Sequence, residues 1–427
     1  MTADILKSTL DNGLTVVLKE THHAPVASFF VWYRVGSRNE RQGQTGISHW
    51  VEHMMFKGTP RYPNGTLDRL VSREGGQWNA FTWLDFTAYY ETIAANRIEL
   101  GLDIESDRMV NTIISPEETD SERTVIISER HMYENHPNFL LAEEMQAAAF
   151  RVHPYHHEVI GDEVDLITMT HEDLENHYRR YYAPNNAIAV AVGDFNTEEM
   201  LARIQEKFGD IPPGDTPEPV RRQEPPQRGE RRVTVEGPGD AAYLTVSYRA
   251  PAATQSDYFP LVLFNAAFAG GSSLGFFGGS GSNKSSRLYK ALVATELAAG
   301  ASGSMAPTID PYLYSLNLIA RPGRSLDEIE AALDAELERV TEDPINEREL
   351  QKALKQAKVQ FVMAGESVTG QAQMIGLAEA VTGDYRWYEN ALERLAAVTL
   401  DDIERVRKEY IRPANRTVGR YLPETRS

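Results

Sequence analysis

The sequence predicts an α+β protein made of two homologous halves. Three observations support this fold class. A segment of helix, proline and strand occurs twice, and a segment rich in proline and charge separates the two copies. Predicted strands also cluster before and after long helical patterns instead of alternating strictly with them. The 427 residues are enough for two domains with substantial cores.

The internal repeat pairs residues 168–193 with residues 397–422. Each copy predicts a threonine N-cap, an amphipathic helix, a stop at proline and then a strand. A constant offset over identities of several residue types indicates a duplication. Five identical pairs share the offset 399 − 170 = 229: Thr170 with Thr399, Asp173 with Asp402, Tyr181 with Tyr410, Pro184 with Pro413, and Asn186 with Asn415.

The segment between the two copies, residues 210–232, lacks apolar periodicity and contains many prolines and charged residues. Such composition is typical of an extended linker. We therefore expect a first domain over residues 1–212, a linker over 213–232 and a homologous second domain over 233–427.

Composition excludes several classes of function. The net charge of −19 argues against nucleic acid or an anionic membrane as a partner. The chain has no cysteine, which excludes disulfides, thiolate zinc sites and a cysteine nucleophile. No stretch approaches the roughly 18 apolar residues of a membrane span, and the first residues lack a secretory signal pattern. We expect a soluble protein of the cytoplasm, or of the periplasm if a signal peptide has been removed.

The stretch GISHWVEHMMFKGT, residues 46–59, is the clearest candidate for chemistry. On a helix, His53 lies one turn along from His49 and roughly 40° round the axis, so both imidazoles can reach one metal ion. Glu52 lies on the adjoining side, within reach of a metal-bound water. The alternative is a buried amphipathic helix with two hydrogen-bonded histidines. A glutamate directly before the second histidine, with apolar residues on both sides, favours the metal site.

A catalytic zinc usually takes three protein ligands and keeps one position for water. We expect the third ligand to be a carboxylate on a neighbouring helix, and residues 115–134 predict a strong helix. Its Glu122 and Glu129 are seven positions apart and share one face. Spacing does not choose between them: one would bind the metal, and the other would orient a ligand or hold the water network. A solvated surface glutamate is the alternative for either.

The stretch 46–59 resembles the inverted zinc motif His-x-x-Glu-His of the pitrilysin/insulinase family of metallopeptidases, the inverzincins, and most closely the mitochondrial processing peptidase branch. Residues 75–93 and 153–161 resemble other segments of the family, and the resemblance extends over essentially the whole chain. It implies two halves of the processing-peptidase type, in which helices pack on a mixed or antiparallel sheet. It also implies a zinc-dependent endopeptidase that acts on oligopeptides or unfolded segments.

The resemblance also implies a role for each candidate residue. One zinc ion per chain would be bound by His49, His53 and Glu129, which follows His53 by 76 positions. Glu122 would be the accessory glutamate of the family. Glu52 would act as the general base that takes a proton from the attacking water and later returns it to the leaving amine.

Residues 75–83 resemble the edge strand with which this family captures the substrate backbone by β-augmentation. Asn79 and Ala80 are therefore candidates for substrate binding, with an ordinary hairpin strand as the alternative. The histidine-rich stretch 153–158 is interpreted as a polar loop and not as a second metal site.

Family members that work alone or as identical pairs carry an arginine and a tyrosine in the second half that hold the substrate carbonyl. Aligned on Ser286-Arg287-Leu288, these two positions hold Val293 and Gly300, and neither side chain donates a hydrogen bond. We therefore expect the chain to be the zinc-bearing subunit of a heterodimer whose homologous partner supplies arginine and tyrosine.

The glycine-rich run 270–283 resembles a loop of the non-catalytic processing-peptidase subunit, with a plain flexible loop as the alternative. Two other functions stay open at this point. A non-catalytic scaffold subunit predicts degraded zinc positions, and a structural metal site predicts a fourth protein ligand.

Overall fold

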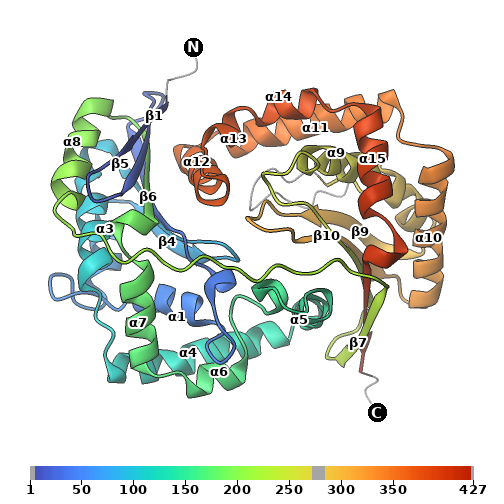
Figure 1. Cartoon of the computed structure of the whole chain (residues 1–427), viewed down its shortest axis with the longest axis horizontal. Coiled ribbons are helices and arrows are strands. Elements are labelled where there is room, and N and C mark those ends of the chain that lie inside the picture. The colour runs from blue at the N-terminus through green and yellow to red at the C-terminus, as the bar shows by residue number, and fades with distance from the viewer. Residues whose placement is uncertain (1–4, 272–283, 425–427) are drawn as a thin grey trace. The chain divides into compact units, whose positions relative to one another are not determined.

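The computed structural model describes residues 5–271 and 284–424, which form two compact units (Figure 1). The first unit comprises Met1–Arg130, His157–Arg222 and Gly365–Tyr388. The second comprises His131–His156, Gln223–Ala364 and Glu389–Ser427. Each unit contains one mixed sheet packed by helices, so the predicted α+β class with two homologous halves is confirmed.

The sheet of the first unit has six strands in the order β1-β2-β6-β3-β5-β4. Only β2 and β6 run parallel, and the other neighbours are antiparallel. Central β3 and β6 are almost entirely buried, and β4 lies at one edge. The strands are β1 (Ile5–Thr9), β2 (Thr15–Glu20), β3 (Val26–Tyr33), β4 (Gln77–Thr82), β5 (Thr87–Ala94) and β6 (Ala187–Gly193).

The sheet of the second unit repeats this pattern with five strands in the order β7-β11-β8-β10-β9. Its pair β7-β11 is parallel, as β2-β6 is in the first sheet, and the other neighbours are antiparallel. Strand for strand, this order matches β2-β6-β3-β5-β4, so the duplication read from the sequence extends to sheet topology. The strands are β7 (Arg231–Gly237), β8 (Tyr243–Arg249), β9 (Ala298–Met305), β10 (Leu313–Ala320) and β11 (Arg416–Pro423).

The repeated sequence segment forms the same local structure in both units. Helices α7 (His171–Tyr181) and α15 (Leu400–Tyr410) each begin at a threonine–aspartate capping box. After each helix comes a 3₁₀ turn that starts at proline and leads into β6 or β11. The amides of Asn186 and Asn415 then donate to the last helical carbonyl, at 2.8 and 2.9 Å. These side-chain contacts explain why the two copies share threonine, aspartate and asparagine.

Each half of the chain also supplies one helix to the other unit. Helix α5 (Pro137–Ala149) packs on β7 and β11, where Leu141 and Met145 contact Tyr421. Helix α12 (Val368–Thr382) packs on β3 and β6, and a Cβ at Gly376 would overlap the Trp32 indole. The compact units therefore differ in composition from the predicted domains 1–212 and 233–427, which follow chain order.

The remaining helices cover the two sheets. Figure 1 shows α3 and α8 on one side of the first sheet and α12 on the other. The predicted linker has no secondary structure from residue 213 to residue 230. The first-half helices are α1 (Ile47–Met54), α2 (Thr66–Arg73), α3 (Glu99–Asn111), α4 (Pro116–Glu134), α6 (Glu163–Thr168) and α8 (Thr197–Phe208). Those of the second half are α9 (Tyr258–Phe268), α10 (Leu326–Glu342), α11 (Glu347–Ala364), α13 (Arg386–Glu389) and α14 (Ala391–Ala396).

Within the described part of the chain, no helix combines the length and apolar character needed to cross a membrane. Most of the glycine-rich run, residues 272–283, lies outside the described residues.

Candidate metal centre

Helix α1 is fixed at its N-terminus by a glycine and a buried carboxylate. Gly46 precedes the helix with φ of 86°, and a Cβ there would overlap the carbonyl of Ile160. The carboxylate of Glu40 accepts the backbone N–H groups of Gly46 and Ser48 at 2.8 and 2.9 Å. These are N–H groups that a helix leaves unpaired at its start. Burial raises the pKa of Glu40, and these hydrogen bonds act in the opposite direction.

The structure brings His49, His53 and Glu129 together. The two histidines lie on α1 and the glutamate lies on α4. Oε2 of Glu129 is 3.8 Å from Nε2 of His49 and 3.5 Å from Nε2 of His53. One potential ligand atom of each residue lies within 4.8 Å of the others, and no other such group of three occurs in residues 5–271 and 284–424.

This donor set fits zinc. Two imidazole nitrogens and one carboxylate oxygen are a ligand set of catalytic zinc sites that keep a fourth position open. Ligand atoms at usual zinc distances in a tetrahedral site lie roughly 3.4 Å apart, close to the two distances found here. The three side chains are 14–24% exposed, so solvent reaches the group. Burial also lowers the pKa of His49 to about 3, which keeps its imidazole neutral, as metal binding requires.

Glu122 lies behind His53. Its Oε1 accepts a hydrogen bond from Nδ1 of His53 at 2.8 Å, which leaves Nε2 of the ring directed at Glu129. The ammonium of Lys57 also contacts the Glu122 carboxylate. Burial opposes the charged form of Glu122, but the hydrogen bonds from His53 and Lys57 hold its pKa below the usual value. Glu122 thus orients a candidate ligand, as carboxylates commonly do around zinc-bound histidine.

Glu52 is buried beside this group, with only 7% of its surface exposed. The hydroxyl of Thr82, the last residue of β4, donates to Oε2 of Glu52 at 2.6 Å. Burial raises the pKa of Glu52 to about 7, although the hydrogen bond from Thr82 lowers it. A carboxyl group with this pKa accepts and returns a proton near neutral pH.

Strand β4 carries the predicted substrate-binding residues. It packs against α1 and pairs only with β5, so its other edge has no strand partner in the described sheet. The Asn79 side chain is exposed, and its Oδ1 accepts the backbone N–H of Ala80 at 2.9 Å. An open strand edge beside the metal group is suited to pairing with an extended peptide.

The two positions predicted to lack arginine and tyrosine lie in the second unit. Val293 ends a π-helical segment, Tyr289–Val293, and Gly300 lies on the edge strand β9. The neighbouring Arg287 is held by Glu349 through hydrogen bonds of 2.7 and 2.6 Å. This ion pair gives Arg287 a structural role. In the histidine-rich stretch, His153 lies 3.1 Å from Asp310 within the second unit.

Sequence reasoning missed three residues that support the group: Glu40, Lys57 and Thr82. Lys57 had only its closeness in sequence to His53 as a signal, because it lies just beyond the end of α1 at Met54. Glu40 and Thr82 had none, because a loop and a strand bring them to α1 through tertiary packing.

Two family models match the chain. One, described as insulinase (peptidase family M16), matches residues 15–163, which include all five candidate residues around the metal group. The other, described as peptidase M16 inactive domain, matches residues 168–357.

Curated relatives are similar over nearly the whole chain. Zinc protease PqqE of Helicobacter pylori is 28% identical over 416 residues, which cover 96% of this chain and 90% of the relative. An uncharacterized zinc protease of Mycobacterium tuberculosis is 27% identical over 408 residues, 95% of this chain and 90% of the relative. The mitochondrial-processing peptidase subunit beta of Lentinula edodes is 27% identical over 417 residues, which cover 95% of this chain and 87% of the relative.

Solved structures show the same fold. The crystal structure of a protease from Helicobacter pylori matches with a TM-score of 0.93 and 26% identity, covering 99% of this chain and 100% of that chain. A putative M16-like peptidase from Alicyclobacillus acidocaldarius matches with a TM-score of 0.83 and 21% identity, covering 99% of both chains. The second likeness concerns the fold alone.

Proposed function

This chain belongs to peptidase family M16, and we propose that it is a zinc-dependent endopeptidase acting on oligopeptides or unfolded segments. The observation that carries this proposal is the convergence of His49, His53 and Glu129 within 4.8 Å, with the buried Glu52 beside them. Relatives named zinc proteases support the same class of activity.

In this proposal His49, His53 and Glu129 hold the zinc ion, and Glu122 keeps the His53 ring in the tautomer that presents Nε2. When bound, zinc supplies Lewis acidity to the attacking water and to the scissile carbonyl. The partial burial of the three ligands lowers the local dielectric, which strengthens the electrostatic interactions in the site.

Glu52 moves the proton. Its carboxylate accepts a proton from the attacking water and returns it to the nitrogen of the leaving amine. Thr82 holds Oε2 of Glu52 by its hydrogen bond, so the other oxygen takes part in the transfer. A pKa of about 7 fits both directions of the transfer near neutral pH.

The substrate lies along β4. An extended peptide added to this edge would be held by main-chain hydrogen bonds, which give affinity with little sequence preference. Because Thr82 ends β4 and also contacts Glu52, a peptide paired with β4 passes close to the catalytic carboxylate. Asn79 and Ala80 are the residues proposed to contact it.

We further propose that the active enzyme is a heterodimer. Val293 and Gly300 supply no donor for a substrate carbonyl, and loss of one such donor costs roughly 10²–10³-fold in rate. A homologous second subunit would supply arginine and tyrosine. A relative named as the beta subunit of mitochondrial-processing peptidase supports a subunit role.

The second candidate is a non-catalytic subunit of the same fold. It is favoured by the match of residues 168–357 to a family model described as an inactive domain. The intact set of candidate ligands in the first half favours the peptidase.

The experiment that tests the peptidase is cleavage of a fluorogenic peptide by the purified zinc-loaded chain and by Glu52→Gln, with the zinc content of both measured. Cleavage that depends on Glu52 is expected, at a low rate if the heterodimer is the active form. A cleavage rate that Glu52→Gln leaves unchanged would contradict the role of Glu52. A stable, fully active homodimer would contradict the heterodimer.

A further inference from the structure

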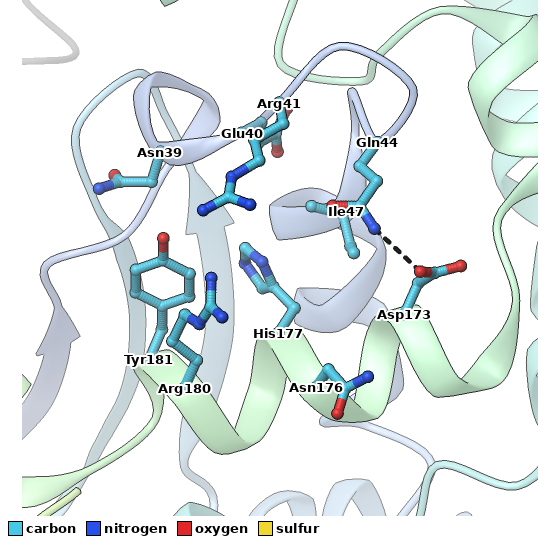
Figure 2. A pocket seen from close by; sticks show the side chains of 10 residues that line it. All are labelled: Asn39, Glu40, Arg41, Gln44, Ile47, Asp173, Asn176, His177, Arg180 and Tyr181. Atoms are coloured by element: carbon cyan, nitrogen blue, oxygen red, sulfur yellow. Dashed lines mark hydrogen bonds between the residues drawn. The ribbon is translucent and has the colours of Figure 1, made fainter. Parts of the chain in front are cut away.

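A polar pocket separate from the metal group lies on the first unit, at the N-terminal end of α1. It has a volume of about 420 Å³ and is bounded by residues 39–47 and by α7 (Figure 2). None of the candidate zinc ligands lines it. Its volume lies within the usual range of small-molecule sites.

Two arginines of this pocket lack ion-pair partners. Among the described residues, no carboxylate lies within 4.0 Å of the guanidinium of Arg41 or Arg180. Nearby Arg179 is paired with Glu175 at 2.7 Å, and Arg38 with Asp85 at 3.7 Å. Both guanidiniums are exposed, and no carboxylate of the protein neutralises them, so both are available to pair with an anion.

The side chains of the pocket converge. Figure 2 shows the guanidinium groups of Arg41 and Arg180 directed toward one another, with His177 and the Tyr181 hydroxyl beside them. The Tyr181 hydroxyl and the His177 imidazole add hydrogen-bond donors to those of the two guanidinium groups.

His177 gives independent support for a ligand. It is only 8% exposed, and one ring nitrogen, Nε2, lies 3.3 Å from the Ser48 hydroxyl. The other ring nitrogen has no hydrogen-bond partner among the described residues. A buried imidazole in a polar pocket normally satisfies both nitrogens, so this nitrogen is available to a bound molecule.

Each acidic group of the pocket is oriented by donors of the protein. Glu40 is engaged by the backbone N–H groups at the start of α1. Asp173 accepts from Gln44 at 2.9 Å and from the backbone of Thr170 at 2.8 Å. Both carboxylates are thus occupied with donors of the protein itself.

We propose that this pocket binds the phosphate group of a small molecule between Arg41 and Arg180. Guanidinium groups present paired donors that match the oxygens of phosphate. Because Glu40 both lines the pocket and caps α1, a bound phosphate compound contacts the segment that fixes the start of the metal-bearing helix. This inference does not depend on the proposed peptidase activity.

The test is isothermal titration calorimetry of the full zinc-loaded chain with inorganic phosphate and, separately, with glycerol 3-phosphate. We expect saturable binding of at least one compound and a Kd that rises roughly tenfold or more in Arg41→Gln and in Arg180→Gln. Tighter binding of the ester would identify a phosphorylated metabolite as the ligand, and equal binding would identify free phosphate. Arg203→Gln, on the surface of α8, removes the same charge elsewhere and should leave the Kd unchanged.

Absence of saturable binding, or equal Kd values in the wild type and both pocket variants, would overturn the proposal. The titration is repeated on the metal-free chain. Binding that disappears without zinc would locate the phosphate at the metal and would also overturn it.

Discussion

Nδ1 of His53 donates a hydrogen bond of 2.8 Å to the carboxylate of Glu122. This contact fixes which nitrogen of His53 is free for a metal, because the proton on Nδ1 leaves Nε2 as the only acceptor of the neutral ring. Nε2 then faces Glu129 at 3.5 Å. The two glutamates of α4 thereby contact opposite sides of one imidazole.

Glu122→Gln should weaken zinc binding without abolishing it. Glutamine keeps the shape but loses the charge that orients and polarises His53, and such changes typically reduce metal affinity 10–100-fold. Competition with a zinc chelator measures the effect. Glu117→Gln is the matched control, because Glu117 is exposed in the first turn of α4; an equal loss there would show that only the overall charge matters.

Thr82→Val should move the acidic limb of the kcat/KM profile to higher pH. The Thr82 hydroxyl favours the charged form of Glu52, so its removal raises the pKa of the base, and a higher pH is needed to ionise it. The measurement is kcat/KM from pH 5 to pH 9 in the wild type, in Thr82→Val and in the control Thr82→Ser, which retains the hydroxyl. A limb that stays in place in Thr82→Val would contradict the assignment of Glu52 as the base.

The metal-free chain should lose stability, relative to metal-free Glu52→Gln, as the pH rises from about 4.5 to about 7. In this window folded Glu52 is protonated, because burial raises its pKa to about 7, while the unfolded group is already ionised. The folded state therefore binds more protons, and the free energy of unfolding falls with rising pH. The difference is on the order of 3 kcal/mol, measurable by urea unfolding. Parallel pH curves for the two proteins would argue against a raised pKa.

Arg108→Met should destabilise the protein by about 3–5 kcal/mol. Arg108 is completely buried beside β5, where it pairs with Glu105 and lies 3.5 Å from Glu91. Its removal leaves two buried carboxyl groups without a cation. Urea unfolding measures the loss. Combining Arg108→Met with Glu105→Gln should recover part of the stability. Arg203→Gln, on the surface of α8, should stay within about 0.5 kcal/mol of the wild type.

The sequence was most informative where chemistry and local periodicity coincide. The helix with His49, Glu52 and His53 follows from residue spacing alone, as does the repeated cap of α7 and α15. Spacing left Glu122 and Glu129 open because both lie on one face of α4. The position of the His53 ring between them distinguishes their contacts, and a ring orientation depends on tertiary packing.

Other features depend on contacts between distant residues. The exchange of α5 and α12 between the units has no local signal, because each helix follows its neighbours in the chain and packs on the sheet of the other half. Thr82 reaches Glu52 across 30 positions only because β4 packs beside α1. Residue spacing along one helix or strand contains no information about such approaches.

The central claim is that His49, His53 and Glu129 hold one zinc ion. The most direct measurement is the zinc content of the dialysed full chain and of His49→Ala, His53→Ala, Glu129→Gln and Glu52→Gln, each checked for folding by circular dichroism. The account predicts one zinc per chain in the wild type and in Glu52→Gln, and loss of zinc from the three ligand variants. Full zinc content in folded ligand variants would show that the metal binds elsewhere and would contradict the account.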